Sequence, residues 1–221
     1  MAGPNLTYHQ PIGVVETTSG LTPLTVSQLE LSGQTFKIGT PVGLSAGGFV
    51  QACAAFTSSG AVTGTLAGFS LTSGLNLGTS GKGAPGAFSQ IGPPGAIQTY
   101  GSVPFQASAV NIAVGAPISD GRTLFESSVG LNIFEATFDN SNGTVAADYT
   151  PTQAMIGTQF GLTIDSSGQW YVDAHLTTPG TNTVVQMVGI NPIDQTSTGG
   201  IYIANARVRF QVLSTARSQY V

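Results

Sequence analysis

From residue 36 onward, short apolar runs alternate with glycine-rich turns, and this punctuation constrains the fold more than any other feature of the chain. Residues 36–44 lead into the turn Ser45-Ala46-Gly47-Gly48, and residues 49–55 form the next apolar run. A third run, residues 62–69, follows the turn Ser58-Ser59-Gly60. Runs of about four to eight residues bounded by such turns are typical of β-strands. The sequence therefore predicts an all-β protein.

Charged residues make up only 7% of the chain, against roughly 25% in an ordinary soluble domain. Long surface helices need Lys and Glu on their wet face, so this composition disfavours them. Charge keeps proteins apart in solution, so we expect other copies of the chain or a partner to cover much of this surface. The alternative is a neutral, hydroxyl-rich surface that is simply solvated. The net charge of −4 disfavours nucleic-acid binding, which needs a basic face.

An internal repeat is visible in the order of the strands. Gly39-Thr40-Pro41-Val42-Gly43-Leu44 matches Gly157-Thr158-Gln159-Phe160-Gly161-Leu162, an offset of 157 − 39 = 118 residues. The next strand matches at an offset of 170 − 49 = 121, and Leu66-Ala67-Gly68-Phe69 matches Met187-Val188-Gly189-Ile190 at the same offset. A preserved order of matches indicates a duplicated unit, although chance similarity among glycine-rich strands is the alternative. We expect two small β-barrel or β-sandwich modules, over residues 35–130 and 131–221.

The first 34 residues differ from the rest, because three prolines interrupt them and no glycine turn spacing is present. We interpret residues 1–34 as an extended arm with one short strand near residues 29–31. An arm with this many apolar residues would lie on a partner, and a frayed tail is the alternative. The candidate partner contacts in the arm are Tyr8, His9, Ile12, Val14 and Val15.

Two further segments are candidates for contacts between copies. Residues 77–95 form a long Gly- and Pro-rich loop that includes Phe88, and such loops are usually binding elements or mobile. The last predicted strand, residues 201–213, alternates near its end, with Val208, Phe210 and Val212 on one face. We expect Arg207 and Arg209 to point outward from that strand. Phe88, Arg207 and Arg209 are the predicted oligomer or partner contacts.

Motifs that could carry catalysis have simpler interpretations. Gly43-Leu44-Ser45-Ala46-Gly47 fits the pattern of a nucleophile elbow, but a strand follows it where that motif needs a helix. Asp173 and His175 lie two apart on a strand and face the same way, but a metal would need a third ligand. The one other imidazole, His9, lies in the predicted arm.

Acidic residues that could pair for glycoside chemistry are Glu126, Glu135, Asp139 and Asp148. They lie where strands and turns need a few polar residues, and Asp139-Asn140-Ser141-Asn142-Gly143 is an ordinary turn. We expect no enzymatic activity, no cofactor and no metal site.

Cys53 is the only cysteine, so we expect no intrachain disulfide and a buried role for this side chain. The first residues lack the basic and apolar regions of a signal peptide, and no run approaches 18 apolar residues. We expect synthesis in a reducing cytoplasm and no contact with a membrane.

Two passages resemble the head decoration, or cement, proteins of tailed phages. The first runs over residues 39–70, with Gly39 to Leu44, Gly47 to Ala52 and Val62 to Ser70. The second runs over residues 157–190 and is closed by Arg207-Val208-Arg209-Phe210. In that family a small β-barrel begins with a Gly-rich strand, and a later strand ends in a small-residue step. The resemblance covers about half of the chain.

The resemblance implies a structural virion protein that binds the outer surface of the expanded capsid and bridges major capsid subunits. It implies a homo-oligomer, with a trimer as the first expectation, and an N-terminal arm that joins the capsid by strand addition. This chain departs from the smallest members in having two modules and a long loop, which leaves open which module docks.

Two other functions fit less well. A phage tail or head-fibre protein would use the loop at residues 77–95 to bind a host receptor. A β-sandwich hydrolase would need a pocket with paired carboxylates.

Overall fold

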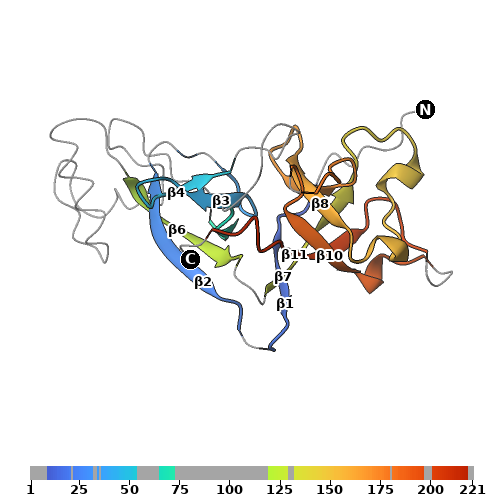
Figure 1. The fold of residues 1–221 in the computed structure, drawn as a ribbon, viewed down its shortest axis with the longest axis horizontal. Coiled ribbons are helices and arrows are strands. Elements are labelled where there is room, and N and C mark those ends of the chain that lie inside the picture. The colour runs from blue at the N-terminus through green and yellow to red at the C-terminus, as the bar shows by residue number, and fades with distance from the viewer. Residues whose placement is uncertain are drawn as a thin grey trace.

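A computed structural model describes residues 9–20, 22–31, 34, 36–53, 65–72, 119–128, 132–179, 181–196 and 201–218. These residues form two closed five-stranded β-barrels side by side, with a few turns of 3-10 helix (Figure 1). The prediction of an all-β protein with two small barrels is confirmed. None of the helices in the described residues is long or apolar enough to cross a membrane.

The first barrel closes in the order β2-β4-β3-β5-β6. Its strands are β2 (Thr25–Leu31), β3 (Pro41–Leu44), β4 (Val50–Ala52), β5 (Gly68–Ser70) and β6 (Ser119–Ser127). All neighbours in the ring are antiparallel except β2 and β4, which run parallel and meet at Glu30 and Val50.

The second barrel closes in the order β7-β11-β10-β8-β9, because β9 also pairs with β7. Its strands are β7 (Asn132–Asp139), β8 (Gln159–Ile164), β9 (Trp170–Asp173), β10 (Val185–Ile190) and β11 (Arg207–Val212). A further strand, β1 (Gly13–Thr17), lies antiparallel on β7. The short helices η2 (Ala146–Tyr149), η3 (Gln153–Met155) and η4 (Pro192–Asp194) lie on the side of this barrel that faces away from the first (Figure 1).

The two barrels have the same topology, strand for strand. The strands β2 to β6 correspond in order to β7 to β11, and the parallel pair β2–β4 corresponds to β7–β9. The hydrogen bond from the Ala67 amide to the Val42 carbonyl corresponds to the bond from Val184 to Phe160. The predicted repeat is therefore present in the backbone hydrogen bonds as well as in the sequence.

The repeat also corrects two of the predicted offsets. The first match, from Gly39 to Gly157, agrees with the pairing. The strand β4 is offset from β9 by 172 − 50 = 122, because Val50 and Val172 occupy the same place beside β2 and β7. The strand β5 is offset from β10 by 184 − 67 = 117. Both offsets were predicted as 121. The β8–β9 hairpin is longer than the β3–β4 hairpin. A sequence match cannot show how many of the extra residues lie in the strands and how many lie in the turn.

Gly43 and Gly161 show why the glycine pattern repeats. A Cβ added to Gly43 would lie 2.3 Å from the carbonyl oxygen of Thr65, and one added to Gly161 would lie 2.5 Å from that of Asn182. In each barrel the segment that leads into the next strand, at Thr65 or Asn182, crosses directly over this glycine. A side chain at either position would collide with backbone, so the two glycines are needed for the same close approach.

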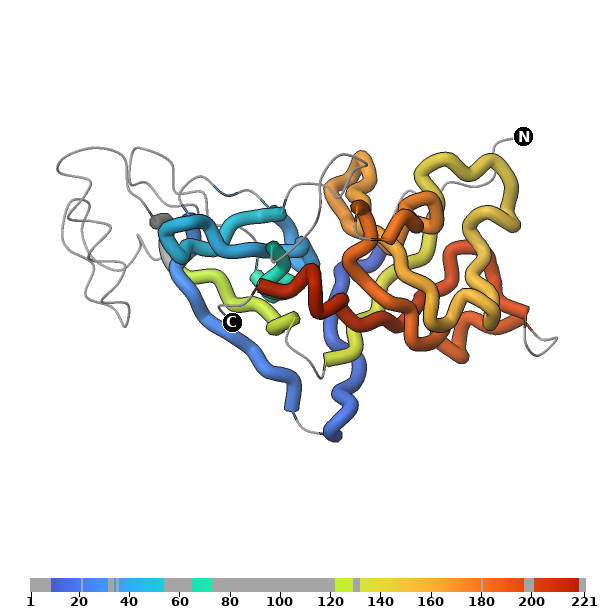
Figure 2. The backbone as a smooth tube through the Cα atoms, viewed as in Figure 1, coloured from blue at the N-terminus to red at the C-terminus, as the bar shows by residue number. Residues whose placement is uncertain are grey.

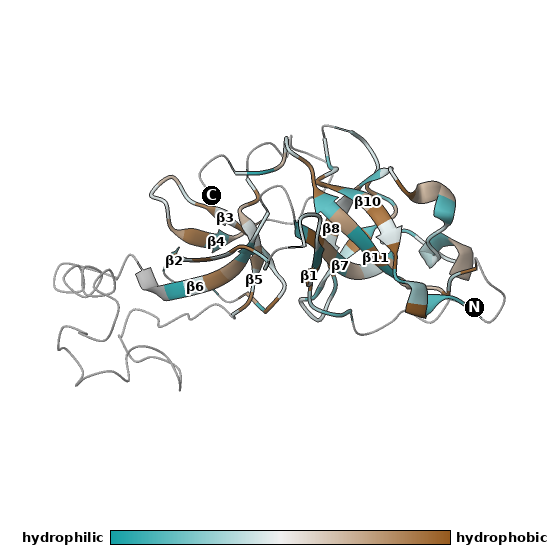
Figure 3. Cartoon of the chain, turned by 90° about the horizontal axis from the view of Figure 1, so that it is seen from below, coloured by the Kyte–Doolittle hydropathy of each residue, from teal (hydrophilic) through white to brown (hydrophobic). Residues whose placement is uncertain are grey.

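The described core is continuous between the barrels. Phe69 of β5 packs against Phe134 of β7, with ring centroids 4.6 Å apart, and both are fully buried. A smaller cluster around Phe125 fills the first barrel. Figure 3 shows that hydrophobic and hydrophilic residues are mixed along the strands of both barrels. The C-terminal residues return to the first barrel, where Arg217 bridges to Leu66 (Figure 2). The two barrels therefore share a core, and the C-terminal segment that follows the second barrel packs on the first.

In residues 9–31 the structure differs from the predicted extended, partner-binding arm. Residues 13–17 form β1 on the second barrel, and residues 25–31 form β2, one of the five strands of the first barrel. The predicted strand at residues 201–213 is also shorter, since β11 begins at Arg207.

Candidate functional site

The predicted arm contacts separate into buried, exposed and undescribed residues. His9 and Ile12 are each only 2% exposed, so in this structure their side chains cannot touch a partner. Val14 packs against the core, and Val15 is exposed. Tyr8, Phe88 and the loop at residues 77–95 lie outside the described residues.

His9 lies between two carboxylates of the second barrel. Its Nε2 is 3.0 Å from Oδ2 of Asp139 at the end of β7, and its Nδ1 is 2.6 Å from Oδ2 of Asp165 in the β8–β9 turn. The imidazole stacks on Tyr171 of β9, with ring centroids 4.5 Å apart. Asp173 is the register partner of Asp139 and is also buried. One histidine thus ties the N-terminal segment to β7, β9 and the turn.

The charges of this cluster stabilise the protonated histidine. Burial alone would lower the pKa of His9, but the hydrogen bonds and charges of Asp139 and Asp165 outweigh it and raise the pKa. Burial would raise the pKa of Asp165, but bonds from His9, Ser167 and Gln169 lower it to about 2. A buried imidazolium held by two carboxylates is a structural ion pair, because neither ring nitrogen is open to a substrate.

Arg207 and Arg209 point outward from β11, as predicted, but both are engaged within the chain. Arg207 donates from Nε and Nη2 to the two carboxylate oxygens of Asp194, each at 2.9 Å, and from Nη1 to Glu135 at 3.3 Å. Arg209 lies 3.5 Å from Glu16 of β1 and 3.6 Å from Glu135. These ion pairs connect β1, β7, β11 and η4 on one face. A contact between copies at Arg207 and Arg209 stays a prediction.

The other motif residues serve local structure. Ser45 Oγ accepts a hydrogen bond from the Phe49 amide across the β3–β4 turn. Asp173 Oδ1 accepts from the amides of Ser141 and His175. Asp148 accepts from the amides of Thr144 and Val145, which lowers the pKa of its carboxyl.

Glu126 lies between the barrels, where it accepts from the Val14 amide. Burial raises its pKa although that bond opposes the shift. The described residues hold no group of three or more His, Cys, Asp and Glu side chains placed to bind a metal ion.

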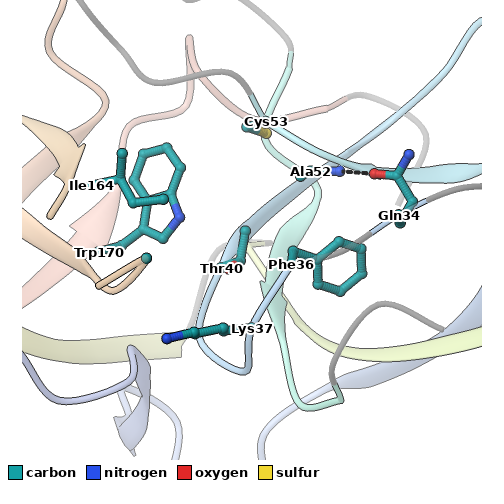
Figure 4. Close-up of a pocket in the computed structure, with 9 residues that line it drawn as sticks. Gln34, Phe36, Lys37, Thr40, Ala52, Cys53, Ile164 and Trp170 are labelled. Carbon is teal, nitrogen blue, oxygen red and sulfur yellow. Dashed lines mark hydrogen bonds between the residues drawn. The ribbon is translucent and has the colours of Figure 1, made fainter. Parts of the chain in front are cut away.

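A cavity of about 330 Å³ lies at the junction of the barrels. Phe36, Thr40 and Cys53 line it from the first barrel, and Ile164 and Trp170 line it from the second (Figure 4). Lys37 also lines it and donates to the Ser167 carbonyl in the β8–β9 turn. Among the described residues, its walls carry one cation, one thiol and no carboxylate, so these residues do not form an acid–base pair.

The far end of the second barrel exposes large apolar side chains. Tyr202 bridges to Gln195 and its hydroxyl bonds to Gln153 of η3, so it faces inward. Ile201 and Ile203 flank it and point the other way, as alternation requires. We use the name distal surface for η2, η3, η4, the residues that adjoin them and residues 201–203. The exposed large apolar side chains on these elements are Val145, Ile156, Ile193, Ile201 and Ile203, whose exposed fractions are 54%, 38%, 80%, 55% and 48%.

Sequence reasoning missed the distal surface and the partners of His9. The one signal in the sequence is the run of three apolar residues Ile201-Tyr202-Ile203. Because no polar residue alternates with them, the sequence does not show which of these side chains face solvent. Asp139 and Asp165 are 130 and 156 residues from His9, and no local pattern connects them.

No model of a known protein family matches the chain, and no curated protein matches it.

Proposed function

We propose that this protein is a structural virion component that binds the outer surface of a phage capsid as an oligomer and stabilises the expanded shell. Its partner is the major capsid protein, and the distal surface is the docking face. The resemblance to decoration proteins supports the virion role, and the exposed isoleucines support the place of docking.

The distal surface carries the proposal. Three isoleucines are about half exposed or more, and Ile193 is 80% exposed. Removing a large aliphatic side chain from water contributes roughly 1.5–3 kcal/mol, so covering these three would drive association. The adjacent charges, Asp194 and Arg207, already neutralise each other, so docking leaves no unpaired ion.

The continuous core suits a protein that transmits load. Phe69, Phe134 and Phe210 pack together across the junction, and the Val14 amide of the N-terminal segment donates to Glu126 of the first barrel. A rigid pair of barrels that docks through one end leaves the other barrel free to contact a neighbouring subunit. An oligomer that grips several capsid subunits gains avidity without stronger individual contacts.

Co-sedimentation with expanded capsids tests the proposal. The wild-type protein should saturate the capsids, and Ile193→Asp and Ile201→Asp should each weaken binding by tenfold or more. Leu24→Asp is the matched control, because Leu24 is 53% exposed but lies near the first barrel. Circular dichroism would verify that all variants are folded. Failure of the wild-type protein to bind would overturn the function, and loss of binding with Leu24→Asp alone would overturn the place of docking.

A further inference from the structure

The cavity between the barrels has the size and position of a site for a small organic molecule. Its volume is about 330 Å³, within the range of roughly 300–1,000 Å³ that is usual for ligand sites. Such sites often lie where two domains meet, and both barrels contribute walls to this one (Figure 4). Phe69 of the first barrel packs on Phe134 of the second, so the two walls belong to one packed body.

The walls of the cavity are mainly apolar and include two aromatic residues. Trp170 of β9 and Ile164 of β8 line it from the second barrel, and Phe36 and Cys53 line it from the first (Figure 4). Rings pack well against other rings, and sulfur atoms also make favourable contacts with them. A ligand with an aromatic ring would therefore exchange water for apolar contacts on both sides.

Lys37 supplies a positive charge at the cavity. Its side chain extends from the first barrel and donates to the Ser167 carbonyl in the β8–β9 turn. An ammonium group has three hydrogens, so this bond leaves two of them for a ligand. Arg207 and Arg209 are paired with carboxylates, but no carboxylate among the described residues forms an ion pair with Lys37.

The lining of the cavity carries no negative charge to oppose an anion. Burial raises the pKa of the Cys53 thiol to about 12, so this side chain is neutral at physiological pH. The carboxylate of Asp165, in the same turn as Ser167, is already bonded to His9. The described walls therefore combine a formal charge of +1 with an apolar interior.

We infer that this cavity binds a small aromatic carboxylate. The ring lies between the apolar walls at Trp170 and Phe36, and the carboxylate accepts hydrogen bonds from Lys37. A charge-assisted bond of this kind is roughly twice as strong as a neutral one, so the site selects acids over uncharged molecules with the same ring. The inference goes beyond the proposed function, since the cavity lies at the junction of the barrels and its ligand needs no capsid.

The fluorescence of Trp170 tests the inference directly, because Trp170 is the only tryptophan of the chain. The probe is 4-iodobenzoate, whose iodine atom quenches indole emission on contact. Titration of the full chain should give saturable quenching with half-saturation below about 1 mM, as expected for a ligand of about ten heavy atoms. The uncharged analogue 4-iodobenzyl alcohol should bind at least tenfold more weakly.

Lys37→Gln tests the role of the cation. It should weaken binding of 4-iodobenzoate by tenfold or more and leave binding of the alcohol unchanged, so the preference for the acid disappears. Arg122→Gln is the matched control, because Arg122 of β6 is also a cation of the first barrel but does not line the cavity. The control should bind both probes as the wild-type protein does.

Ile164→Glu tests the place of binding from the other barrel. Ile164 is 42% exposed, so the fold should tolerate a carboxylate there, and that carboxylate would repel the ligand and pair with Lys37. Binding of 4-iodobenzoate should again fall by tenfold or more. Ile156→Glu is the matched control, since Ile156 is 38% exposed but lies on the distal surface. Thermal melts would verify that all four variants are folded.

Three results would overturn the inference. Quenching that rises linearly without saturation is collision alone, and equal binding of the acid and the alcohol would exclude the role of charge. Unchanged binding in Lys37→Gln or Ile164→Glu, or an equal loss in their controls, would place the ligand elsewhere. None of these results depends on capsid binding, which is measured separately with the distal-surface variants.

Discussion

Glu30 and Phe138 occupy the same place in the two barrels. Glu30 lies beside Val50 in the parallel pair β2–β4, and Phe138 lies beside Val172 in the parallel pair β7–β9. Both side chains are fully buried. Thr123 donates its hydroxyl to the Glu30 carboxylate, and the equivalent of Thr123 in the second barrel is Val208. The first barrel thus holds a polar pair where the second holds an apolar one.

Thr123→Val should lower the free energy of unfolding by about 1–3 kcal/mol, because Glu30 loses a buried hydrogen-bond donor. Urea denaturation measures this change. Thr163→Val is the control, since Thr163 is only partly buried on β8 and should change stability by less than about 0.5 kcal/mol. Equal effects of the two substitutions would contradict the role of the Thr123 hydroxyl.

His9→Ala should be one of the most destabilising substitutions in the N-terminal segment. It leaves the carboxylates of Asp139 and Asp165 without their shared cation, and breaking a buried pair in this way costs roughly 3–5 kcal/mol. Gln10→Ala is the control, because the Gln10 side chain is exposed. A change below about 1 kcal/mol for His9→Ala would show that the segment does not depend on this ion pair.

The same cluster predicts how stability depends on pH. The pKa of His9 is raised above its ordinary value of 6.5, so its contribution is complete below that value and is lost as pH rises through the raised pKa. The pKa of Asp165 is lowered from 3.8 to about 2, so its contribution is complete above 3.8 and is lost as pH falls towards 2.

The difference in unfolding free energy between the wild-type protein and His9→Ala should therefore be largest between pH 4 and 6.5. It should shrink on either side of that range. Urea titrations of both proteins at pH 3, 5 and 9 would show this. A difference that grows from pH 5 to pH 9 has the wrong sign for a raised histidine pKa.

Gly43→Ala and Gly161→Ala should each destabilise the fold by about 1–3 kcal/mol or more, because the new methyl group collides with a backbone carbonyl. Gly189→Ala is the control, since a Cβ there would meet nothing closer than 3.9 Å. Thermal melts of the three variants would rank them. Tolerance of alanine at both Gly43 and Gly161 would argue against the shared close approach.

The sequence predicts the second barrel better than the first. On β11 the residues Val208, Phe210 and Val212 alternate with Arg207 and Arg209, and the structure buries the apolar set. On β2 the inward positions are Val26, Gln28 and Glu30, while Leu29 faces the other way. The polar residues of this strand face the barrel interior, so the alternation of apolar and polar residues predicts the wrong face as buried. For this reason only the last residues of β2 were predicted as a strand.

The ion pairs of the N-terminal segment were not predictable for a different reason. An apolar segment with three prolines resembles an arm that awaits a partner. His9 and Ile12 instead bury themselves against residues more than 25 positions away, including Asp139, Asp165 and Gly39. Only the closure of the second barrel brings Asp139 and the β8–β9 turn together, and a long-range closure of this kind has no local signature.

The most direct test of the proposed function is the copy number of this chain in virus particles purified from its source, measured by quantitative mass spectrometry. Decoration of the shell predicts a ratio approaching one copy per major capsid subunit. A handful of copies per particle would contradict it and favour a tail or fibre protein, and complete absence would remove the chain from the virion.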